Sequence, residues 1–415
     1  MKKNIYTTLT KYLLLILLII TSCTTGSKKL TSKAVFNDSI IAQIYLEKDI
    51  AQDKKISMDS LIEYMDYITP EFTNESMLSK YDKILFSEEY LFILENNVNN
   101  KAVFIFDLDG KYISKVNSIG QGPGEYSEIS DFYYDDKNAL IGVLSNSQIL
   151  RYNLNGEFQD KVNLRKYLIS EIAYNNGSIY AYSNSLSNVE DGYSLIVFDE
   201  DFNPIYTDYP LNKKLINFPL TFNKRTLSNN QKNVFFNAIN NDTIYSVHSD
   251  YMDAKYIMNF GEYKFPDSNF KELLEDGEKA IDKLNMLYDS KYILFGIQDY
   301  HVTDKYLYIN FLKNTMIFHS FYSFDTQKSM TFSSSSQNLY PLNVFPVKVI
   351  SGSYDNNFYM TLDNGFIEHI KFKEEQENIS ELKDDDPRKI RYNKILKNFD
   401  PNNNNTIAVF RLKDF

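Results

Sequence analysis

A glycine-rich segment, Gly120-Gln121-Gly122-Pro123-Gly124-Glu125-Tyr126, comes closest in this chain to a loop that could hold a phosphate group. Its three glycines allow tight turns that leave backbone N–H groups exposed. A P-loop, however, needs Gly-Lys-Ser/Thr at the start of a helix, and a dinucleotide loop also opens a helix. This segment has no such lysine, and a strand is expected to follow it. It therefore predicts a tight turn, with Gln121, Glu125 and Tyr126 as candidates for contact with a ligand.

The acidic turns and histidines of the sequence do not form a recognisable metal site. Asp107-x-Asp109-Gly110 begins like a calcium loop, but basic and apolar residues occupy the later ligand positions, which favours a solvated hairpin turn. The spacings H-x-x-x-H and H-E-x-x-H are absent among the four histidines, His248, His301, His319 and His369. No G-x-S-x-G motif is present either. We therefore predict no metal and no cofactor, and we assign no catalytic residue.

The only cysteine, Cys23, stands at the end of a signal-like N-terminus. Lys2 and Lys3 precede an apolar run, Leu13 to Ile20, which has the length of a signal-peptide core and is too short to span a bilayer. The residues Ile20-Thr21-Ser22-Cys23 resemble the lipobox of bacterial lipoproteins, in which the cysteine is lipidated and becomes the first residue of the mature chain. The alternative is an uncleaved anchor with a buried cysteine.

We accordingly expect residues 1–22 to be a signal peptide and residues 23–54 to be the lipidated cysteine and a flexible tether. Thr24 stands where an aspartate would favour inner-membrane retention, so the expected location is the outer membrane, facing the periplasm, with surface exposure as the alternative. The formal charge of the whole chain is −11. Such an anionic protein is not expected to bind nucleic acid, and its link to the membrane is the lipid on Cys23.

A repeat of 46 residues organises most of the remaining chain. An aromatic residue that ends one strand, followed by Asx and Gly at a turn, recurs at Phe106, Tyr152 and Phe198, and more faintly at Tyr245. Two further copies, at Phe324 and Phe410, follow after insertions. A repeat of this length made of four short strands is typical of a propeller blade. The six copies predict an all-β fold, a six-bladed β-propeller over residues 55–415, with an irregular β-sandwich as the alternative.

Two helical insertions and one N-terminal strand complete this predicted fold. The first insertion, about residues 266–290, carries apolar residues at helical spacing. The second, about residues 374–400, is charged and contains an expected helix from Pro387 to Phe399. The last copy of the repeat lies so near the C-terminus that its blade lacks an outer strand. The alternating segment Glu63 to Ile68 is expected to supply that strand and so to close the last blade.

These features together resemble the six-bladed β-propeller lipoproteins of Bacteroidetes. The resemblance rests on the Gly120 to Tyr126 segment between two blades, the Asp-Leu-Asp-Gly turn before it, Asp242 to Tyr245 followed by Asn259-Phe260-Gly261, and the final Phe410-Arg411-Leu412-Lys413. It covers roughly residues 55 to 413 and departs from the family pattern at Asn402 to Asn405. The family is related in architecture to NHL-repeat propellers. The resemblance implies the fold but no particular function.

The sequence leaves three functions open. The preferred one is a binding protein that presents the funnel face of the propeller to a small ligand, a peptide or an envelope protein. Connections between blades are expected on that face, so the candidate contacts are Gln121, Glu125, Tyr126, Arg165 and Arg225, of which the two arginines could favour an anionic ligand. The alternatives are an envelope hydrolase or lyase with its site in the central funnel, and a structural part of an envelope complex with a large apolar patch.

Overall fold

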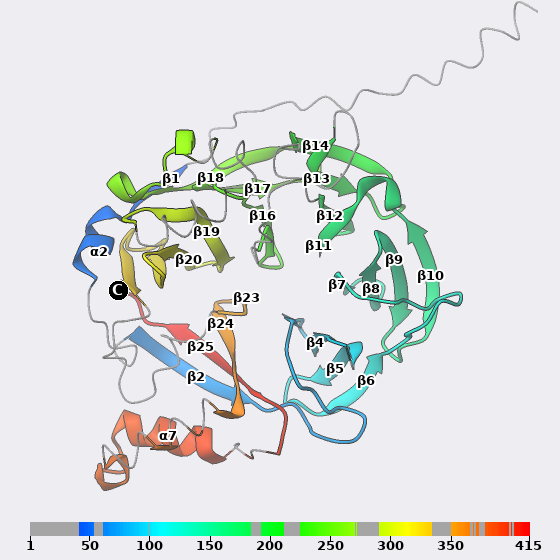
Figure 1. Cartoon of the computed structure of the whole chain (residues 1–415). Helices are drawn as coiled ribbons and strands as arrows, with labels where there is room; N and C mark the ends of the chain where they lie inside the picture. The colour runs from blue at the N-terminus through cyan, green and yellow to red at the C-terminus, as the bar shows by residue number, and fades with distance from the viewer. Residues whose placement is uncertain are drawn as a thin grey trace, which may run out of the picture. The chain divides into compact units, whose positions relative to one another are not determined.

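The computed structural model describes residues 41–53, 61–98, 100–183, 192–210, 225–269, 271, 290–333, 350–365, 368, 371–372, 378–397, 400 and 402–415. They belong to one compact unit and form six sheets that stand around a common centre like the blades of a propeller (Figure 1). The first strand of each blade lines that centre, and the following strands lie progressively further out. The predicted six-bladed, mainly β fold is therefore confirmed.

Blades 1 to 3 each contain four consecutive antiparallel strands. Blade 1 comprises β3 (Lys83–Phe86), β4 (Tyr90–Asn96), β5 (Lys101–Asp107) and β6 (Tyr112–Val116). Blade 2 comprises β7 (Asp131–Asp135), β8 (Leu140–Ser145), β9 (Gln148–Asn153) and β10 (Phe158–Asn163). Blade 3 comprises β11 (Ile169–Asn175), β12 (Ser178–Ser183), β13 (Tyr193–Phe198) and β14 (Pro204–Pro210).

Blades 4 and 6 also include strands from the N-terminal part of the chain. Blade 4 comprises β15 (Leu227–Asn229), β16 (Val234–Phe236), β17 (Thr243–Val247), β18 (Met252–Asn259) and β1 (Ala42–Tyr45). Blade 5 comprises β19 (Ile293–Val302), β20 (Tyr306–Lys313), β21 (Met316–Ser323) and β22 (Ser329–Ser333). Blade 6 comprises β23 (Gly352–Tyr354), β24 (Asn357–Leu362), β25 (Thr406–Leu412) and β2 (Ile62–Ile68).

The same turn between the third and fourth strands recurs in blades 1 to 3, and it accounts for the 46-residue period. Asp107, Asn153 and Asp199 occupy equivalent positions, and Oδ1 of each accepts backbone N–H bonds from the residues two and four positions later. Gly110, with φ of +87°, completes the turn in blade 1. The side-chain oxygen of Asp107 is thus used to fold a hairpin, as the sequence predicts.

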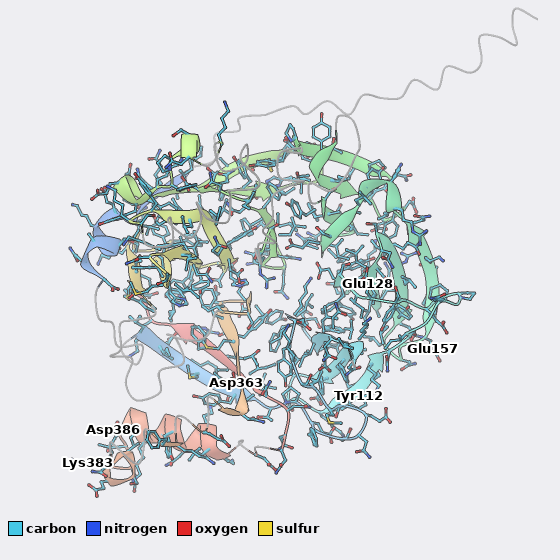
Figure 2. All side chains as sticks on the ribbon, in the orientation of Figure 1. Tyr112, Glu128, Glu157, Asp363, Lys383 and Asp386 are labelled. Carbon is cyan, nitrogen blue, oxygen red and sulfur yellow. The ribbon has the colours of Figure 1, made fainter. Side chains whose placement is uncertain are left out.

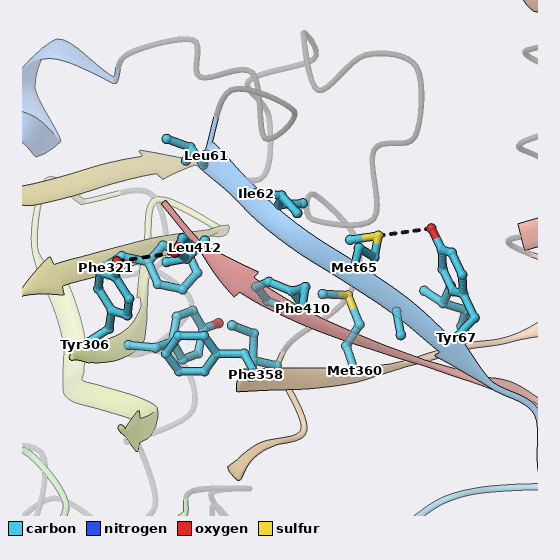
Figure 3. Close-up of a cluster of buried hydrophobic side chains, with 14 of the residues drawn as sticks. Leu61, Ile62, Met65, Tyr67, Tyr306, Phe321, Phe358, Met360, Phe410 and Leu412 are labelled. Carbon is cyan, nitrogen blue, oxygen red and sulfur yellow. Dashed lines mark hydrogen bonds between the residues drawn. The ribbon is translucent and has the colours of Figure 1, made fainter. Parts of the chain in front are cut away.

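Aromatic and branched side chains fill the spaces between neighbouring blades. Successive residues of a strand point to opposite faces, so each sheet presents side chains to both of its neighbours. Between blades 5 and 6, Tyr306 and Phe321 pack in one cluster with Phe358 and Phe410, and Met65 of β2 joins them (Figure 3). Burial of each such side chain contributes about 1.5–3 kcal/mol. This packing fixes the positions of the sheets around the centre.

Two N-terminal strands fasten the ring from outside. As predicted, β2 pairs antiparallel with β25, with Tyr67 opposite Ala408, and blade 6 thereby gains its outer strand. β1 has no counterpart in the prediction, and it pairs in parallel with β18, the last strand of blade 4. A short helix, α2 (Glu47–Gln52), follows β1 and contacts β22 of blade 5. We call β1, α2 and β2 the double clasp.

The prediction of a flexible tether over residues 23–54 is therefore wrong for its last part. Ile44, Leu46 and Ile50 are almost completely buried in the core cluster that blades 4 and 5 share. Asp49 accepts a hydrogen bond from Ser329 (2.6 Å), and Asp53 accepts one from the hydroxyl of Ser333 (2.8 Å). These contacts fasten residues 42–53 to the propeller.

The structure tests the remaining expectations about the chain only in part. α7 (Pro387–Lys397) begins at the expected proline and confirms the helix of the second insertion. The first insertion lies mostly outside the described residues, although residues 267–269 are helical. The expected signal peptide, residues 1–22, and Cys23 lie outside the described residues altogether, so their roles stay predictions. Within the described part of the chain, no helix has the length and apolar character needed to cross a membrane.

Candidate functional site in the central cavity

The inner strands of the six blades enclose a cavity of about 1420 Å³ at the centre of the ring. Residues of β3, β7, β11, β15, β19 and β23 all line it, so every blade contributes one wall. Figure 2 shows side chains reaching towards this centre from the surrounding blades. Binding sites for small molecules are usually concave and lie on a rigid scaffold, which makes this cavity the candidate functional site.

Charged side chains from neighbouring blades are bonded to one another along the cavity wall. We call this set the charged ring, and it consists of Lys83, Asp131, Glu171, Arg225, Asp299 and His301. Lys83 of blade 1 donates to Asp131 of blade 2 over 2.5 Å, and the other oxygen of Asp131 accepts the N–H of Ile172 in blade 3 over 2.8 Å. Glu171 in turn accepts the N–H of Leu227 in blade 4 over 2.8 Å. Side chains thus join the first four blades in sequence.

Further bonds continue from the charged ring through blades 5 and 6 and return to blade 1. Arg225 Nε lies 3.0 Å from Asp299 Oδ1 of blade 5, and Arg225 Nη2 donates to the carbonyl of Ser351, next to blade 6. His301 Nε2 lies 3.2 Å from the carbonyl oxygen of Ile350, so this nitrogen carries the proton. Tyr359 of β24 donates to the carbonyl of Ile84 in blade 1 over 2.9 Å. Hydrogen bonds and ion pairs therefore connect all six blades around the cavity.

Burial and neighbouring charges shift the pKa values of Glu171, Arg225 and His301. Burial and the nearby Asp131 raise the pKa of Glu171 to about 7, although its bond from Leu227 favours the ionised form. Burial opposes the charge of Arg225, but Asp299 and Glu171 outweigh it and raise the pKa of the guanidinium. Burial lowers the pKa of His301 despite the nearby Asp299. At neutral pH, His301 is therefore neutral and Glu171 is partly protonated.

Aromatic side chains surround the cavity where the inner strands end. We call them the aromatic rim, and they are Phe86, Tyr90, Tyr134, Tyr174 and Tyr354. The ring centroids of Tyr90 and Tyr134 are 6.2 Å apart, and those of Phe86 and Tyr354 are 5.9 Å apart, so rings of neighbouring blades contact each other. All five side chains are half-buried. The aromatic rim thus places partly exposed aromatic rings along the cavity wall.

Three exposed carboxylates stand in the hairpin turns next to the aromatic rim. We call Glu88, Glu89 and Asp136 the rim carboxylates; all three line the cavity. Burial and the nearby Tyr90 raise the pKa of Tyr134 to about 12, and the charges of Glu89 and Asp136 add to this effect. Within the described residues, no three His, Cys, Asp or Glu side chains gather as they would around a metal ion.

The candidate loop Gly120 to Tyr126 does not line the cavity. Tyr126 is 2% exposed, and its hydroxyl donates to the carbonyls of Lys101 and Val116 in blade 1. Gly124 lies directly against the ring of Phe158, which belongs to the outer strand β10. The loop leaves the outer strand of blade 1 and packs against the outer strand of blade 2, so its residues do not border the cavity, and their contact with a ligand stays a prediction. Gln121 and Glu125 are exposed there.

The two candidate arginines lie in different places. Arg165 is exposed in a single turn, η1 (Arg165–Tyr167), and does not line the cavity. Arg225 lines the cavity as a member of the charged ring. The other members and the aromatic rim were missed by sequence reasoning. The signal that could have found them is their position on the first strand after each connection between blades, where one face of the strand points to the axis.

Comparisons with known proteins give the fold and a family. A family model described as "Domain of unknown function (DUF4934)" matches residues 41–411. A crystal structure from Bacteroides fragilis, of a protein named "Putative exported protein", is 17% identical with a TM-score of 0.69, and the match covers 90% of this chain and 100% of that one. A member of the duf4221 family from Bacteroides vulgatus is 12% identical with a TM-score of 0.47, covering 85% and 97% of the two chains. No protein with a curated description matches.

Proposed function

The chain belongs to the DUF4934 family, and on that premise we propose that it is an exported, lipid-anchored β-propeller that binds a small ligand in its central cavity. The observation that carries the binding role is the cavity itself, with six fixed walls and a half-buried aromatic rim. A preorganised site of this kind loses little conformational entropy when it binds a ligand. Apolar faces beside polar groups are the usual composition of a small-molecule site.

Two observations support export and anchoring. The residues Ile20-Thr21-Ser22-Cys23 resemble a lipobox after an apolar run of signal-peptide length. The Bacteroides fragilis protein with the same fold carries a name that describes it as exported. The attached lipid chains would hold the propeller at the membrane, which we propose to be the outer membrane.

An enzymatic role in the cavity is the weaker alternative. Glu171, whose pKa is raised to about 7, is the side chain that an acid–base mechanism would need. Its carboxylate, however, accepts the backbone N–H groups of Thr226 and Leu227 and thereby joins blade 3 to blade 4. These hydrogen bonds give Glu171 a structural role in the cavity wall. Its presence there can therefore be explained without a catalytic role.

The binding role is tested by equilibrium dialysis of the full chain against a small-molecule extract of the cell envelope, followed by mass spectrometry. Ser130 is exposed within the cavity, whereas Gln121 is exposed outside it. We expect the wild-type protein and the control Gln121→Trp to enrich a compound that Ser130→Trp, which adds a bulky side chain to the cavity wall, enriches less. If no compound is enriched, or if Ser130→Trp enriches it equally, the ligand-binding role is wrong.

Anchoring is tested separately by feeding the expressing cells an alkyne-tagged fatty acid. We expect the full chain to carry the label and to fractionate with membranes, and Cys23→Ala to do neither, since Cys23 is the only cysteine. A label that persists on Cys23→Ala would contradict the lipidation site.

A further inference from the structure

The basic side chains that line the cavity are all paired with carboxylates, three of which belong to the cavity wall. Among the described residues, four lysine or arginine side chains line it. Each forms an ion pair, namely Lys80 with Asp82, Lys83 with Asp131, Arg225 with Asp299, and Lys232 with Asp304. An anionic ligand would have to displace a carboxylate from any of these cations. The expectation that Arg225 favours an anionic ligand is therefore not supported by its surroundings.

The carboxylates of the cavity outnumber these cations. Asp82, Asp131 and Asp299 are used in the ion pairs, whereas Glu171 and the three rim carboxylates form none with the described residues. A cleft with excess charge of one sign and poorly polarisable walls concentrates the potential in its interior. The cavity consequently attracts positive charge, most strongly near Glu88, Glu89 and Asp136.

The aromatic rim lies among the same carboxylates. Tyr90 follows Glu88 and Glu89 directly in the chain, and Tyr134 precedes Asp136 by two residues. The face of an aromatic ring is the negative part of its quadrupole and attracts a cation placed over it. Ring faces and carboxylates thus favour the same charge of ligand at the same end of the cavity.

We propose that the aromatic rim and the rim carboxylates bind a small organic cation that carries an ammonium or guanidinium group. This inference rests on the proposed ligand-binding function of the cavity and names the chemical class of its ligand. The cationic group lies against the tyrosine faces and is neutralised by the rim carboxylates. A bare metal ion fits less well, because it needs several converging oxygen ligands, and the rim carboxylates come from the turns of two different blades.

The test compares choline, butylammonium and ethylguanidinium with 3,3-dimethylbutan-1-ol, the uncharged analogue of choline, by isothermal titration calorimetry on the full chain. We expect at least one of the three cations to bind at least tenfold more tightly than the uncharged analogue, and butyrate not to bind. The affinity should fall as ionic strength rises, because salt screens the attraction between exposed charges. If none of the three cations exceeds the uncharged analogue, or if butyrate binds as well, the inference is wrong.

Matched variants locate the site. The triple variant Glu88→Gln, Glu89→Gln, Asp136→Asn, which removes the charges of the rim carboxylates, should weaken cation binding at least tenfold. Glu128→Gln removes an exposed carboxylate that does not line the cavity and should change nothing. Equal affinities in the triple variant and the wild type would overturn the proposed site.

The dialysis experiment separates failure of this inference from failure of the proposed function. Cavity-dependent enrichment of a neutral or anionic compound would overturn the cationic ligand and leave the binding role standing. The absence of any cavity-dependent compound would overturn both.

Discussion

The charged ring and the aromatic rim line the same cavity but differ in how their polar groups are satisfied. In the charged ring, Lys83, Asp131, Arg225 and Asp299 all have partners in another blade, and their side chains are between 7% and 27% exposed. Beside the aromatic rim, the rim carboxylates Glu88, Glu89 and Asp136 are exposed and form no ion pair with the described residues. Paired buried charges hold elements together, whereas unpaired charges in a cavity are available to a ligand. The difference is consistent with a stabilising role for the charged ring, and with the proposed recognition role for the rim carboxylates.

The largest effect is expected when the charged ring loses one partner. Arg225→Ala should lower the free energy of unfolding by about 3 kcal/mol, because it leaves Asp299 without its cation in a partly buried position. Lys232→Ala removes an exposed ion pair with Asp304 and should cost at most about 1 kcal/mol. Urea denaturation of both variants measures the contrast. Equal losses would mean that the ion pair of the charged ring contributes no more to stability than an exposed ion pair.

The next effect is a dependence of stability on pH that originates in Glu171. Its pKa is raised from 4.5 to about 7 in the folded protein, so the folded state binds the proton more tightly than the unfolded state does. The stabilisation is therefore complete below about pH 4.5 and is lost as the pH rises through about 7, by on the order of 3 kcal/mol. Glu171→Gln should flatten this part of the stability profile. A slope unchanged in the variant would show that another group causes it.

A smaller effect on stability is expected in the aromatic rim. Tyr134→Leu keeps an apolar side chain but removes the ring contact with Phe92, whose centroid is 4.6 Å away, and should cost about 1 kcal/mol. The same variant should bind organic cations at least tenfold more weakly, as measured by calorimetry. If it lost stability as Arg225→Ala does but kept its affinity, the assignment of roles would be reversed.

The smallest effect on stability is expected for the rim carboxylates. The triple variant Glu88→Gln, Glu89→Gln, Asp136→Asn removes exposed groups without ion pairs and should change the free energy of unfolding by no more than about 0.5 kcal/mol. An unchanged stability would show that the weaker cation binding of this variant is not caused by unfolding. A large destabilisation would instead show that these carboxylates have a structural role.

The fold was predictable from the sequence because each blade repeats one local signal. Asp107, Asn153 and Asp199 mark the same hairpin turn at a fixed interval, and a turn of this kind depends only on residues up to four positions away. β2 was predictable from the missing strand of blade 6. β1 and α2 were not predictable. The sequence of a segment as short as Ala42–Tyr45 does not indicate which sheet edge the strand will pair with.

The site was less predictable than the fold, because the members of the charged ring come from five separate blades. Arg225 was a candidate, but its partner Asp299 lies 74 residues later and no local spacing relates the two. Tyr126 was chosen from a conspicuous loop, yet its ring fills the space between blades 1 and 2. Glycine-rich spacing identified a turn, and only the three-dimensional arrangement shows which side chains face the axis.

The double clasp makes the order of folding depend on the whole chain. Thr69, just after β2, bonds to Thr406 across a sequence separation of 337 residues, and Glu47, just after β1, accepts a bond from Glu262 across 215 residues. Such contacts have a high contact order, and the entropy of closing so long a loop must be overcome before they form. During synthesis the N-terminal strands emerge first and remain without partners until the last blade follows. Completion of the ring is therefore the expected slow step of folding, and a chain truncated before β25 would leave β2 without its partner and blade 6 unfinished.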